Sequence, residues 1–307
     1  MTVALTIIAA VVAIALIKAT PLIYAGLGGV ISENAGIVNI ALEGMMVAGA
    51  FAAVLASYYT HSLPLALLAA VMAGALLAWL LAWFALRLRA DQIIVGMAIN
   101  ILAIGGAAYL LSAVFGQPGA SPEVTSFASL GGDSSGGNNL VSLVTHPLRY
   151  ALFWLAVVLV IAMQVFLYRT RAGVHLRAVG EEPRAAATAG INVFAYRYWA
   201  AIAGGALAAL GGAYLSIGEV DLYSDGMVAG RGFIALAAVI FGKWSPLGTV
   251  GACIFFGFFS SLQIALQRAD VPAQLLEMLP YLLTIVAIGG FIGKSRAPAA
   301  DGIPYEQ

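Results

Sequence analysis

The chain has 307 residues, of which 62% are hydrophobic and 9% are charged, and its formal net charge at pH 7 is zero. A typical soluble domain carries about 25% charged residues, so this composition excludes a soluble globular protein. The zero net charge gives no argument for binding to nucleic acid, and the single cysteine excludes a disulfide framework within one chain.

Apolar segments of about 20 residues, the length that crosses a bilayer core, recur along the whole chain. We therefore predict an all-α polytopic membrane protein in which residues 1–307 form a single transmembrane domain. The predicted segments, about ten in number, are 3–17, 20–31, 42–60, 64–86, 92–115, 147–168, 192–217, 228–242, 246–266 and 273–293.

The first apolar run differs from a secretory signal peptide in the order of its charges. A signal peptide places its positive charge before the apolar run, whereas Lys18 follows the run here. We therefore expect residues 3–17 to be retained as the first helix.

Polar residues interrupt the apolar pattern in SENAGIVNIALEGMM, which we call the polar stretch (residues 32–46). It contains Glu33, Asn34, Asn39 and Glu43, and the last two share one face if the segment is helical. A carboxylate at the bilayer centre costs about 2.5–3.5 kcal/mol, so these side chains must face protein or a water-filled cavity. Two interpretations stay open: the polar side chains line a translocation pathway, or they brace a break in the helix.

The loops differ in charge in a way that predicts orientation. Arginine is frequent in residues 87–92 and 168–184, whereas residues 116–147 contain no Lys or Arg. The positive-inside rule puts the arginine-rich loops in the cytoplasm and the 116–147 loop outside. Alternating sides at each predicted helix then puts both termini in the cytoplasm.

Two of the predicted segments, 20–31 and 228–242, are too short to span a bilayer comfortably, and one lies in each half of the chain. Such a pair predicts an internal repeat with broken helices near the midplane. In the second break, Arg231 either pairs with an acid such as Asp225 or lines the pathway. Phe233 lies beside it and is an aromatic candidate for the pathway.

The sequence contains no recognisable catalytic, metal-binding or nucleotide-binding set. His61, His146 and His175 lie on different loops and lack the spacing of a helical metal pair. The segment GGFIGKS (289–295) follows Ile288, where a phosphate-binding loop requires glycine. We therefore expect no catalytic residues and no metal or cofactor bound by this chain.

The segment HLRAVGEEPRAAATAGINVFAYRYWA (175–200) predicts a short cytoplasmic helix within a loop at 169–191. Two acidic residues and Pro183 suit the first turn of that helix, and Gly190 suits its C-terminal end. The alanines between them would let another protein approach closely. An ordinary connecting helix is the alternative interpretation.

Three motifs resemble one family of membrane proteins. The run RAVGEEPRAAATAGINV resembles the coupling loop of permeases of bacterial ABC importers, in the branch that serves nucleosides and simple sugars. That branch belongs to the ribose and branched-chain amino acid permease superfamily. ENAGIVNIALEGMMVAGAF resembles its early signature and GRGFIALAAVIFGKWSPLG its late signature. The family carries Asn where this chain has Glu182, which is a mild departure.

The resemblance implies a permease subunit in a bacterial inner membrane, importing nucleosides or related simple sugars. It implies a second permease subunit, usually non-identical, two ABC ATP-binding subunits and an extracytoplasmic substrate-binding protein as partners, besides the lipid bilayer. ATP and Mg²⁺ would be bound by the ATP-binding subunits, so this chain would not be an enzyme. The alternative function is a secondary transporter driven by an ion gradient, which broken helices and midplane acids would also suit.

The resemblance also assigns two groups of residues. The residues expected to couple to the ATPase are Glu181, Glu182, Pro183, Arg184, Ala185, Ala186, Ala189 and Gly190. The residues expected beside the substrate pathway are Glu33, Asn34, Asn39, Glu43, Arg231 and Phe233.

Overall fold

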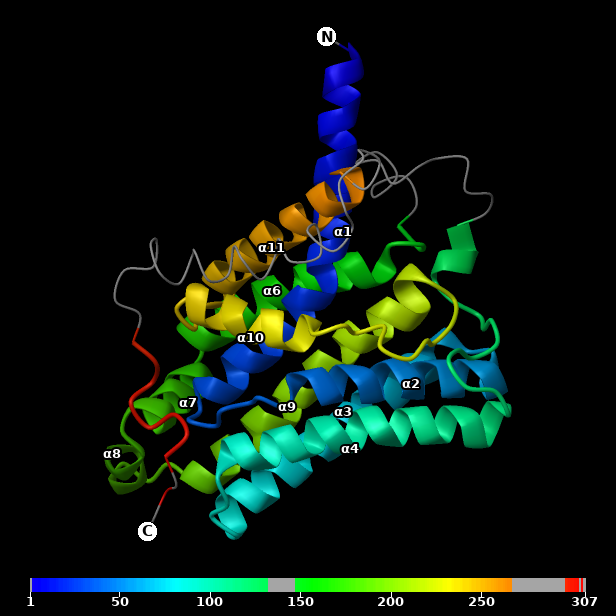
Figure 1. Cartoon of the computed structure of the whole chain (residues 1–307). Helices are drawn as coiled ribbons and strands as arrows, with labels where there is room; N and C mark the ends of the chain where they lie inside the picture. Colours follow the sequence, from blue (N-terminus) through cyan, green and yellow to red (C-terminus); the bar gives the residue numbers. More distant parts are fainter. Residues whose placement is uncertain (1, 132–146, 267–295, 304, 306–307) are drawn as a thin grey trace.

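The computed structural model describes residues 2–131, 147–303 except 267–295, and residue 305 (Figure 1). Within these residues the chain is helical, with no β-strand and one isolated β-bridge between Ala120 and Ser224. The predicted all-α class is therefore confirmed for the described part. The helices are α1 (Thr2–Glu33), α2 (Leu42–Thr60), α3 (Leu63–Arg87), α4 (Gln92–Phe115), η1 (Ala128–Gly131), α6 (Ala151–Arg169), α7 (Arg171–Glu181), α8 (Pro183–Thr188), α9 (Val193–Ala213), η2 (Tyr214–Glu219), α10 (Arg231–Phe241) and α11 (Pro246–Leu266).

The two segments predicted at 3–17 and 20–31 form one continuous helix, α1, so the predicted break between them is wrong. Pro21 lies inside α1 and cannot donate a backbone hydrogen bond. The helix continues through Pro21 because neighbouring helices pack around it in the bundle. Lys18 pairs with a carboxylate instead of ending the helix.

Seven helices, counted among the described residues, are long and apolar enough to cross a membrane. They are α1, α2, α3, α4, α6, α9 continued by η2, and α11. Helix α10 has 11 residues, which is about 16 Å of helix against a bilayer core of about 30 Å. The predicted segment at 273–293 lies outside the described residues, so the count of about ten spans is not confirmed.

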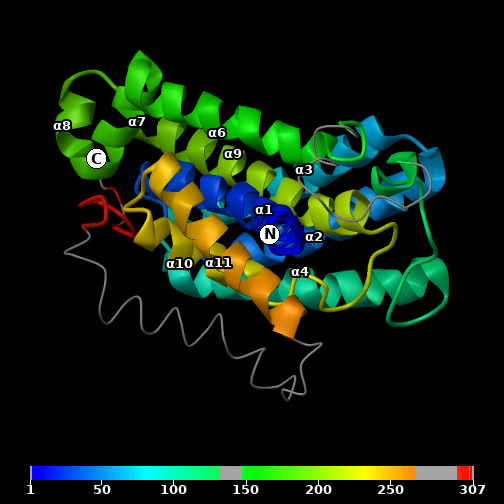
Figure 2. The ribbon, with the colours of Figure 1, turned by 90° about the horizontal axis from the view of Figure 1, so that it is seen from above.

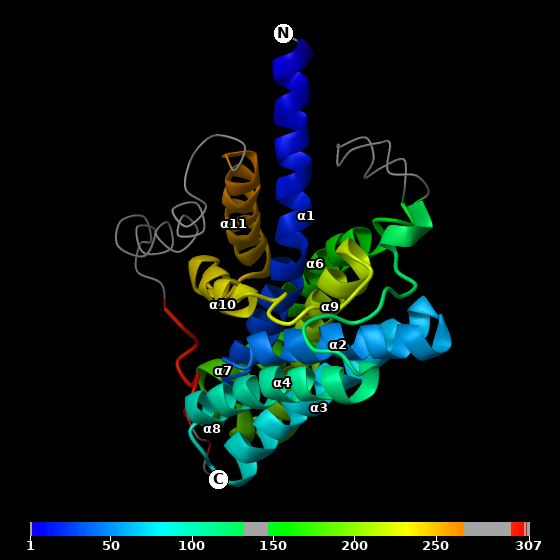
Figure 3. The ribbon, with the colours of Figure 1, turned by 45° about the vertical axis from the view of Figure 1, so that its right-hand side comes forward.

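Helix α9 lies at the centre of the packing, in contact with α1, α2 and α3. Figure 2 shows α9 beside α1, and Figure 3 shows α11 running along α1. The helices approach closely because small residues face each other. A Cβ atom on Gly28 would lie 2.4 Å from the Gly204 carbonyl oxygen, and one on Gly74 would lie 2.3 Å from that of Gly205. Small residues at helix crossings are typical of packing in membranes.

Large apolar side chains remain exposed on the outward faces of α3, α4 and α6. Among them are Leu68, Met72, Leu76, Ile94, Ile101, Tyr109, Val158 and Ile161. A continuous apolar exterior on helices of spanning length suits contact with lipid or with another membrane subunit. The charged groups of the polar stretch, by contrast, are buried inside the bundle.

Candidate functional site

Helix α10 is too short to span, and its N-terminal end is held by a carboxylate from α2. The first N–H groups of a helix have no partner within the helix. Glu43, in the first turn of α2, accepts hydrogen bonds from the N–H of Gly230 at 2.8 Å and of Gly232 at 2.7 Å. Gly232 permits this approach, because a Cβ atom there would lie 2.4 Å from the Glu43 nitrogen. Glu43 is 5% exposed, so it is a buried helix cap.

The C-terminal end of α10 is held by the first residues of the polar stretch. The chain leaves α10 through Lys243 and Trp244, both with a φ of 53°. The Trp244 indole N–H donates to the carboxylate of Glu33. The side-chain amide of Asn34 donates to the carbonyl oxygen of Trp244 at 2.9 Å and to that of Val30 at 2.7 Å. Both ends of α10 are therefore held by the same polar stretch.

Asn39 points into the core. It is fully buried, and its amide nitrogen lies 3.4 Å from the Ser32 hydroxyl oxygen. Its amide oxygen is buried and has no hydrogen-bond partner among the described residues. Asn39 thus does not cap a freed backbone group, which the bracing interpretation expected of it.

Two amides from α4 complete the bracing, and the sequence interpretation missed both. Asn100 donates to the carbonyl of Ile40 at 2.9 Å and accepts from the N–H of Gly44 at 2.7 Å. Gln92 accepts from the N–H of Val38 at 2.8 Å. The signal was present in the sequence as two amide residues within the otherwise apolar run QIIVGMAINIL.

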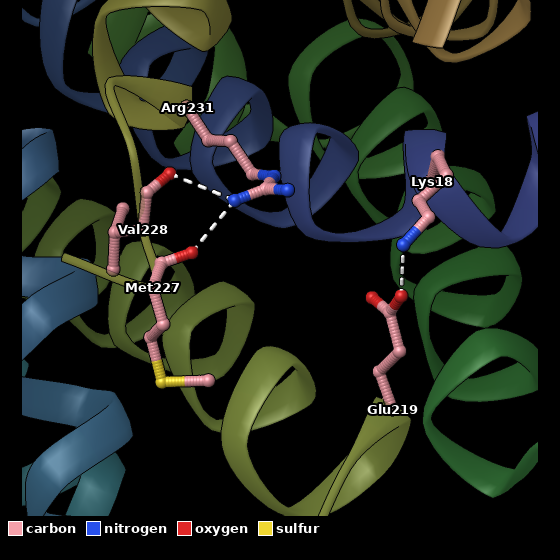
Figure 4. Close-up of polar contacts among 5 residues, drawn as sticks. All are labelled: Lys18, Glu219, Met227, Val228 and Arg231. Atoms are coloured by element: carbon pink, nitrogen blue, oxygen red, sulfur yellow. Dashed lines mark hydrogen bonds and ion pairs between the residues drawn. The ribbon is translucent and has the colours of Figure 1, made fainter. Parts of the chain in front are cut away.

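Arg231 closes the turn that precedes α10 instead of pairing with Asp225. Figure 4 shows its guanidinium donating to the carbonyl oxygens of Met227 at 2.7 Å and Val228 at 3.0 Å. The described residues contain no ion pair between Arg231 and Asp225, so that predicted pair is wrong. The figure also shows the ion pair between Lys18 and Glu219. Phe233 is 43% exposed, on the outward face of α10.

The predicted coupling segment folds as the end of α7 followed by the six-residue helix α8. Glu181 ends α7, Glu182 precedes α8, and Pro183 opens α8. Ala186 is buried, with 4% exposure, which differs from the expected small outward face. The exposed residues of the segment are Glu181, Glu182, Arg184, Ala185, Thr188, Ala189 and Gly190.

The coupling segment lies directly against the polar stretch. Gly180, in the last turn of α7, packs so closely that a Cβ atom there would lie 2.2 Å from the carbonyl oxygen of Asn34. Asn34 in turn holds Trp244 at the end of α10. A movement of α8 and the adjoining end of α7 can therefore reach α10 through two contacts, that of Gly180 with Asn34 and that of Asn34 with Trp244.

The structure also reveals a buried cation that the sequence interpretation did not single out. Arg197, near the start of α9, is fully buried and donates to the carbonyl oxygens of Ile303 at 3.0 Å and Ala300 at 3.4 Å. Gly36 gives it room, because a Cβ atom there would lie 2.7 Å from the guanidinium. Asp301 lies nearby, and burial raises the pKa of its carboxyl to about 7, although Arg197 acts in the opposite direction.

The histidines do not form a site in the described part of the chain. His61 follows α2, and the His175 ring nitrogen lies 3.0 Å from the Tyr196 hydroxyl. His146 and the 289–295 segment lie outside the described residues. No group of three His, Cys, Asp or Glu side chains that could hold a metal ion occurs among the residues searched.

The comparisons with known proteins agree with this architecture. The family model for the permease component of the branched-chain amino acid transport system matches residues 11–288. The chain is 41% identical to the guanosine ABC transporter permease protein NupQ of Bacillus subtilis, with 97% of each chain covered. It is 37% identical to the nucleoside ABC transporter permease protein NupC of Lactococcus lactis, with 96% of each covered.

Two weaker matches are a solved structure and a second permease of Bacillus subtilis. A solved inward-facing ABC transporter of the metal-chelate type matches with a TM-score of 0.51 and 15% identity, over 94% of this chain and 97% of that chain. This likeness concerns the fold alone. Bacillus subtilis also has NupP, a guanosine ABC transporter permease protein 25% identical to this chain, over 92% of this chain and 83% of NupP.

The family model covers most of the chain, and the match to NupQ runs almost from end to end. The chain therefore belongs to the family of permease components typified by the branched-chain amino acid transport system, and it is a membrane-embedded subunit of an ABC transporter and not an enzyme.

Proposed function

We propose that the chain is the permease subunit of an ATP-driven importer of nucleosides, with simple sugars as the second substrate class. The named substrates of NupQ and NupC support nucleosides. A relative from Haloferax volcanii, 32% identical over 88% of each chain and named as a glucose permease, supports sugars. The ion-gradient alternative is not supported, because the family and these relatives are ABC transporter permeases.

The observation that carries the mechanism is the packing of Gly180 on the turn that holds α10. An ATP-binding subunit docked on residues 181–190 would displace α8 when it binds ATP. The displacement would pass from Gly180 to Asn34 and from there to Trp244 at the end of α10. Glu43 would hold the other end of α10 as a pivot. Transport follows if one position of α10 favours a pathway open to the outside and the other a pathway open to the cytoplasm. The ATPase would shift the equilibrium between these two states.

The candidate pathway residues divide by burial. Glu33, Asn34 and Glu43 are each less than 10% exposed and hold the ends of α10, so we assign them to bracing. Asn39 is fully buried against Ser32 and we assign it to the core. Phe233 is 43% exposed on α10, and we assign it to the pathway, where an aromatic ring can stack on a nucleobase or a sugar face. Arg231 stabilises the turn before α10, the helix that contains Phe233.

The partners follow from the family and from the packing. A second permease subunit would cover the exposed face of α10, and the occurrence of NupP beside NupQ in one organism supports a non-identical pair. ATP and Mg²⁺ would be bound by the ATP-binding subunits, and an extracytoplasmic binding protein would deliver the substrate.

The membrane is the bacterial inner membrane, with residues 87–92 and 169–191 in the cytoplasm and the 116–147 loop outside. The C-terminal residues would be cytoplasmic, because Ala300 bonds to Gly180 of α7. The prediction of a cytoplasmic N-terminus depended on two helices before residue 33. Since α1 is one helix, the same alternation puts the start of α1 outside.

The internal repeat stays a prediction, together with a single domain over residues 1–307. Its original basis is weakened, because the short segment predicted at 20–31 is part of α1. What supports it is one parallel between the halves of the chain. Helix α1 ends at Glu33 and the helical run of α9 ends at Glu219, and each long central helix is followed by an irregular break before the next helix.

The test of the substrate class uses the cognate binding protein and the reconstituted transporter. Calorimetry with nucleosides, free bases, pentoses, hexoses and amino acids should give binding for nucleosides first. Proteoliposomes with the complete complex should accumulate the bound compound only with ATP. Binding of amino acids alone would overturn the substrate class, and uptake driven by an ion gradient without ATP would overturn the mechanism.

A further inference from the structure

The C-terminal residues 296–303 and 305, here called the tail, are fixed to the coupling segment by contacts across more than a hundred positions of sequence. The Ala300 N–H donates to the Gly180 carbonyl at 2.8 Å, and the Ala299 N–H donates to the Glu181 carboxylate at 3.4 Å. Arg197 binds the tail from the other side through the carbonyl of Ile303 at 3.0 Å. The tail is thus part of the same surface as α8.

Apolar packing continues the attachment. Tyr305 forms a small cluster with Val179, Ala186 and Val193, and its ring lies 5.5 Å from that of Phe194 between centroids. This cluster explains why Ala186 faces inward. One side of α8 is covered by the tail, and the other side remains open.

A cavity of about 350 Å³ lies between α8 and the tail, and both contribute to its wall. The residues that line it are Glu181, Glu182, Pro183, Arg184, Ala299, Ala300, Ile303 and Tyr305. The lining contains two exposed acidic residues, Glu181 and Glu182, and one exposed arginine, Arg184, and its Ile303 is 55% exposed. The cavity is therefore open, mixed in polarity and mildly acidic.

These features fit a protein partner and not a membrane surface. Anionic headgroups would be repelled by Glu181 and Glu182. A cationic side chain flanked by apolar contacts would instead find two carboxylates against the single guanidinium of Arg184, beside the exposed Ile303. The partner expected at this place is the ATP-binding subunit.

The size of α8 gives a second, independent argument. A specific interface buries about 800 Å² on each partner. Helix α8 has six residues, of which Arg184, Ala185 and Thr188 are exposed. Helix α8 alone is too small for such an interface, and the tail is the element attached beside it.

We propose that the tail forms the second half of the docking surface for the ATP-binding subunit, and that a cationic side chain of that subunit enters the cavity between the tail and α8. This inference rests on the proposed function, which assigns the docking of the ATP-binding subunit to residues 181–190.

The first experiment measures the reaction of single cysteines with a maleimide in the detergent-solubilised permease pair, with and without the ATP-binding subunit. The native Cys253 is fully buried and serves as the background. The variants are Ile303→Cys on the tail, Ala189→Cys beside α8, and Tyr59→Cys at the far end of α2, which is 66% exposed in the wild type. We expect the subunit to slow the first two about fivefold or more, because interface cores exclude water, and to leave the third unchanged.

The outcomes separate the inference from the proposed function. Protection of both Ile303→Cys and Ala189→Cys supports the two-part surface. Protection of Ala189→Cys alone overturns the role of the tail and leaves the docking assignment intact. If neither site is protected while the subunit is bound, the docking assignment itself fails.

The second experiment tests the charge of the occupant. Glu182→Lys should weaken binding of the ATP-binding subunit about tenfold, because a buried cation would then meet a like charge. Glu182→Gln should have a smaller effect. Glu123→Lys makes the same charge change at an exposed site in the loop expected outside the membrane and should bind as the wild type does. Equal affinity for Glu182→Lys and the wild type would overturn the cationic occupant.

Discussion

At the scale of single residues, the acids and amides of the polar stretch act as structural partners. A carboxylate inside a membrane protein marks either a pathway or a contact that needs its charge. Glu43 accepts two backbone hydrogen bonds, and Glu33 accepts one from an indole. Both side chains are less than 10% exposed, which favours a structural contact over a place in the pathway.

Replacing Glu43 tests that role directly. Glu43→Leu leaves the N–H groups of Gly230 and Gly232 without acceptors, and each bond to a charged group contributes about 1.5–3 kcal/mol. We expect Glu43→Leu to lower the free energy of unfolding by about 3 kcal/mol or more, and Glu43→Gln to lower it by less, as measured by thermal unfolding in detergent. Glu123→Gln is the exposed control. Loss of transport by Glu43→Leu at an unchanged melting temperature would instead assign Glu43 to the pathway.

The burial of Asp301 leads us to predict that attachment of the tail weakens as pH rises. Burial raises the pKa of its carboxyl from 3.8 to about 7 in the attached state. The attached tail therefore holds a proton that the detached tail has lost, and attachment loses stability as pH rises from about 4 to about 7. Between pH 6 and pH 8 the detached fraction should rise about tenfold. Labelling of Ala300→Cys in the permease pair alone measures this fraction, because residue 300 is 7% exposed while the tail is attached.

The matched variant for this measurement is Asp301→Asn, which cannot titrate. Once the labelling rate is corrected for the ionisation of the cysteine itself, the Asp301→Asn protein should show no change with pH. A corrected rate that rises equally in both proteins would show that another group controls attachment.

At the scale of helices, the ends of the apolar runs predicted boundaries well, and local capping signals explain why. The ranges 42–60 and 92–115 agree with α2 and α4. Asp91 caps α4 by accepting from two backbone N–H groups, and Gly116 ends it with a φ of 71°. Such signals lie within a few residues of the helix end, so they can be read without knowledge of the fold.

The sequence interpretation failed where the partner of a residue is distant in sequence. The segments 3–17 and 20–31 were predicted as separate on either side of Lys18, but Glu219 pairs with Lys18 from the end of η2 and the helix continues. The acceptors that hold α10 lie 187 and 189 positions away from it. Periodicity and caps contain no information about such pairs, so the polar stretch could be identified as special but its bracing of α10 could not be assigned.

The contact between α7 and the polar stretch gives a prediction at this scale. Gly180→Ala would bring a methyl group to 2.2 Å from the Asn34 carbonyl oxygen, so α7 must move away. We expect the ATP-binding subunit still to bind, while transport per ATP hydrolysed falls several-fold. Gly105→Ala, at a helix glycine with no atom within 4 Å of the added carbon, is the control. Normal coupling in Gly180→Ala would contradict the proposed route.

At the scale of the whole molecule, two regions with different exteriors meet at the polar stretch. The helices of spanning length present apolar side chains outward on α3, α4 and α6. The α7–α8 segment and the tail carry the exposed charges of Glu181, Glu182 and Arg184. The residues that couple the two regions are nearly all buried, which suits a transporter whose energy source is a separate subunit.

The arrangement of α1 predicts that the two ends of the chain lie on opposite sides of the membrane. Helix α1 runs without a break from Thr2 to Glu33, where it meets α7 through Asn34. If that end is cytoplasmic, a helix that crosses once must begin outside. A short tag added before α1 should be cleaved by protease in intact spheroplasts, whereas a tag added after the tail should be cleaved only when the membrane is opened. Protection of both tags in spheroplasts would show that α1 does not cross the membrane once, and that the alternation must be counted again from the cytoplasmic loop at 87–92.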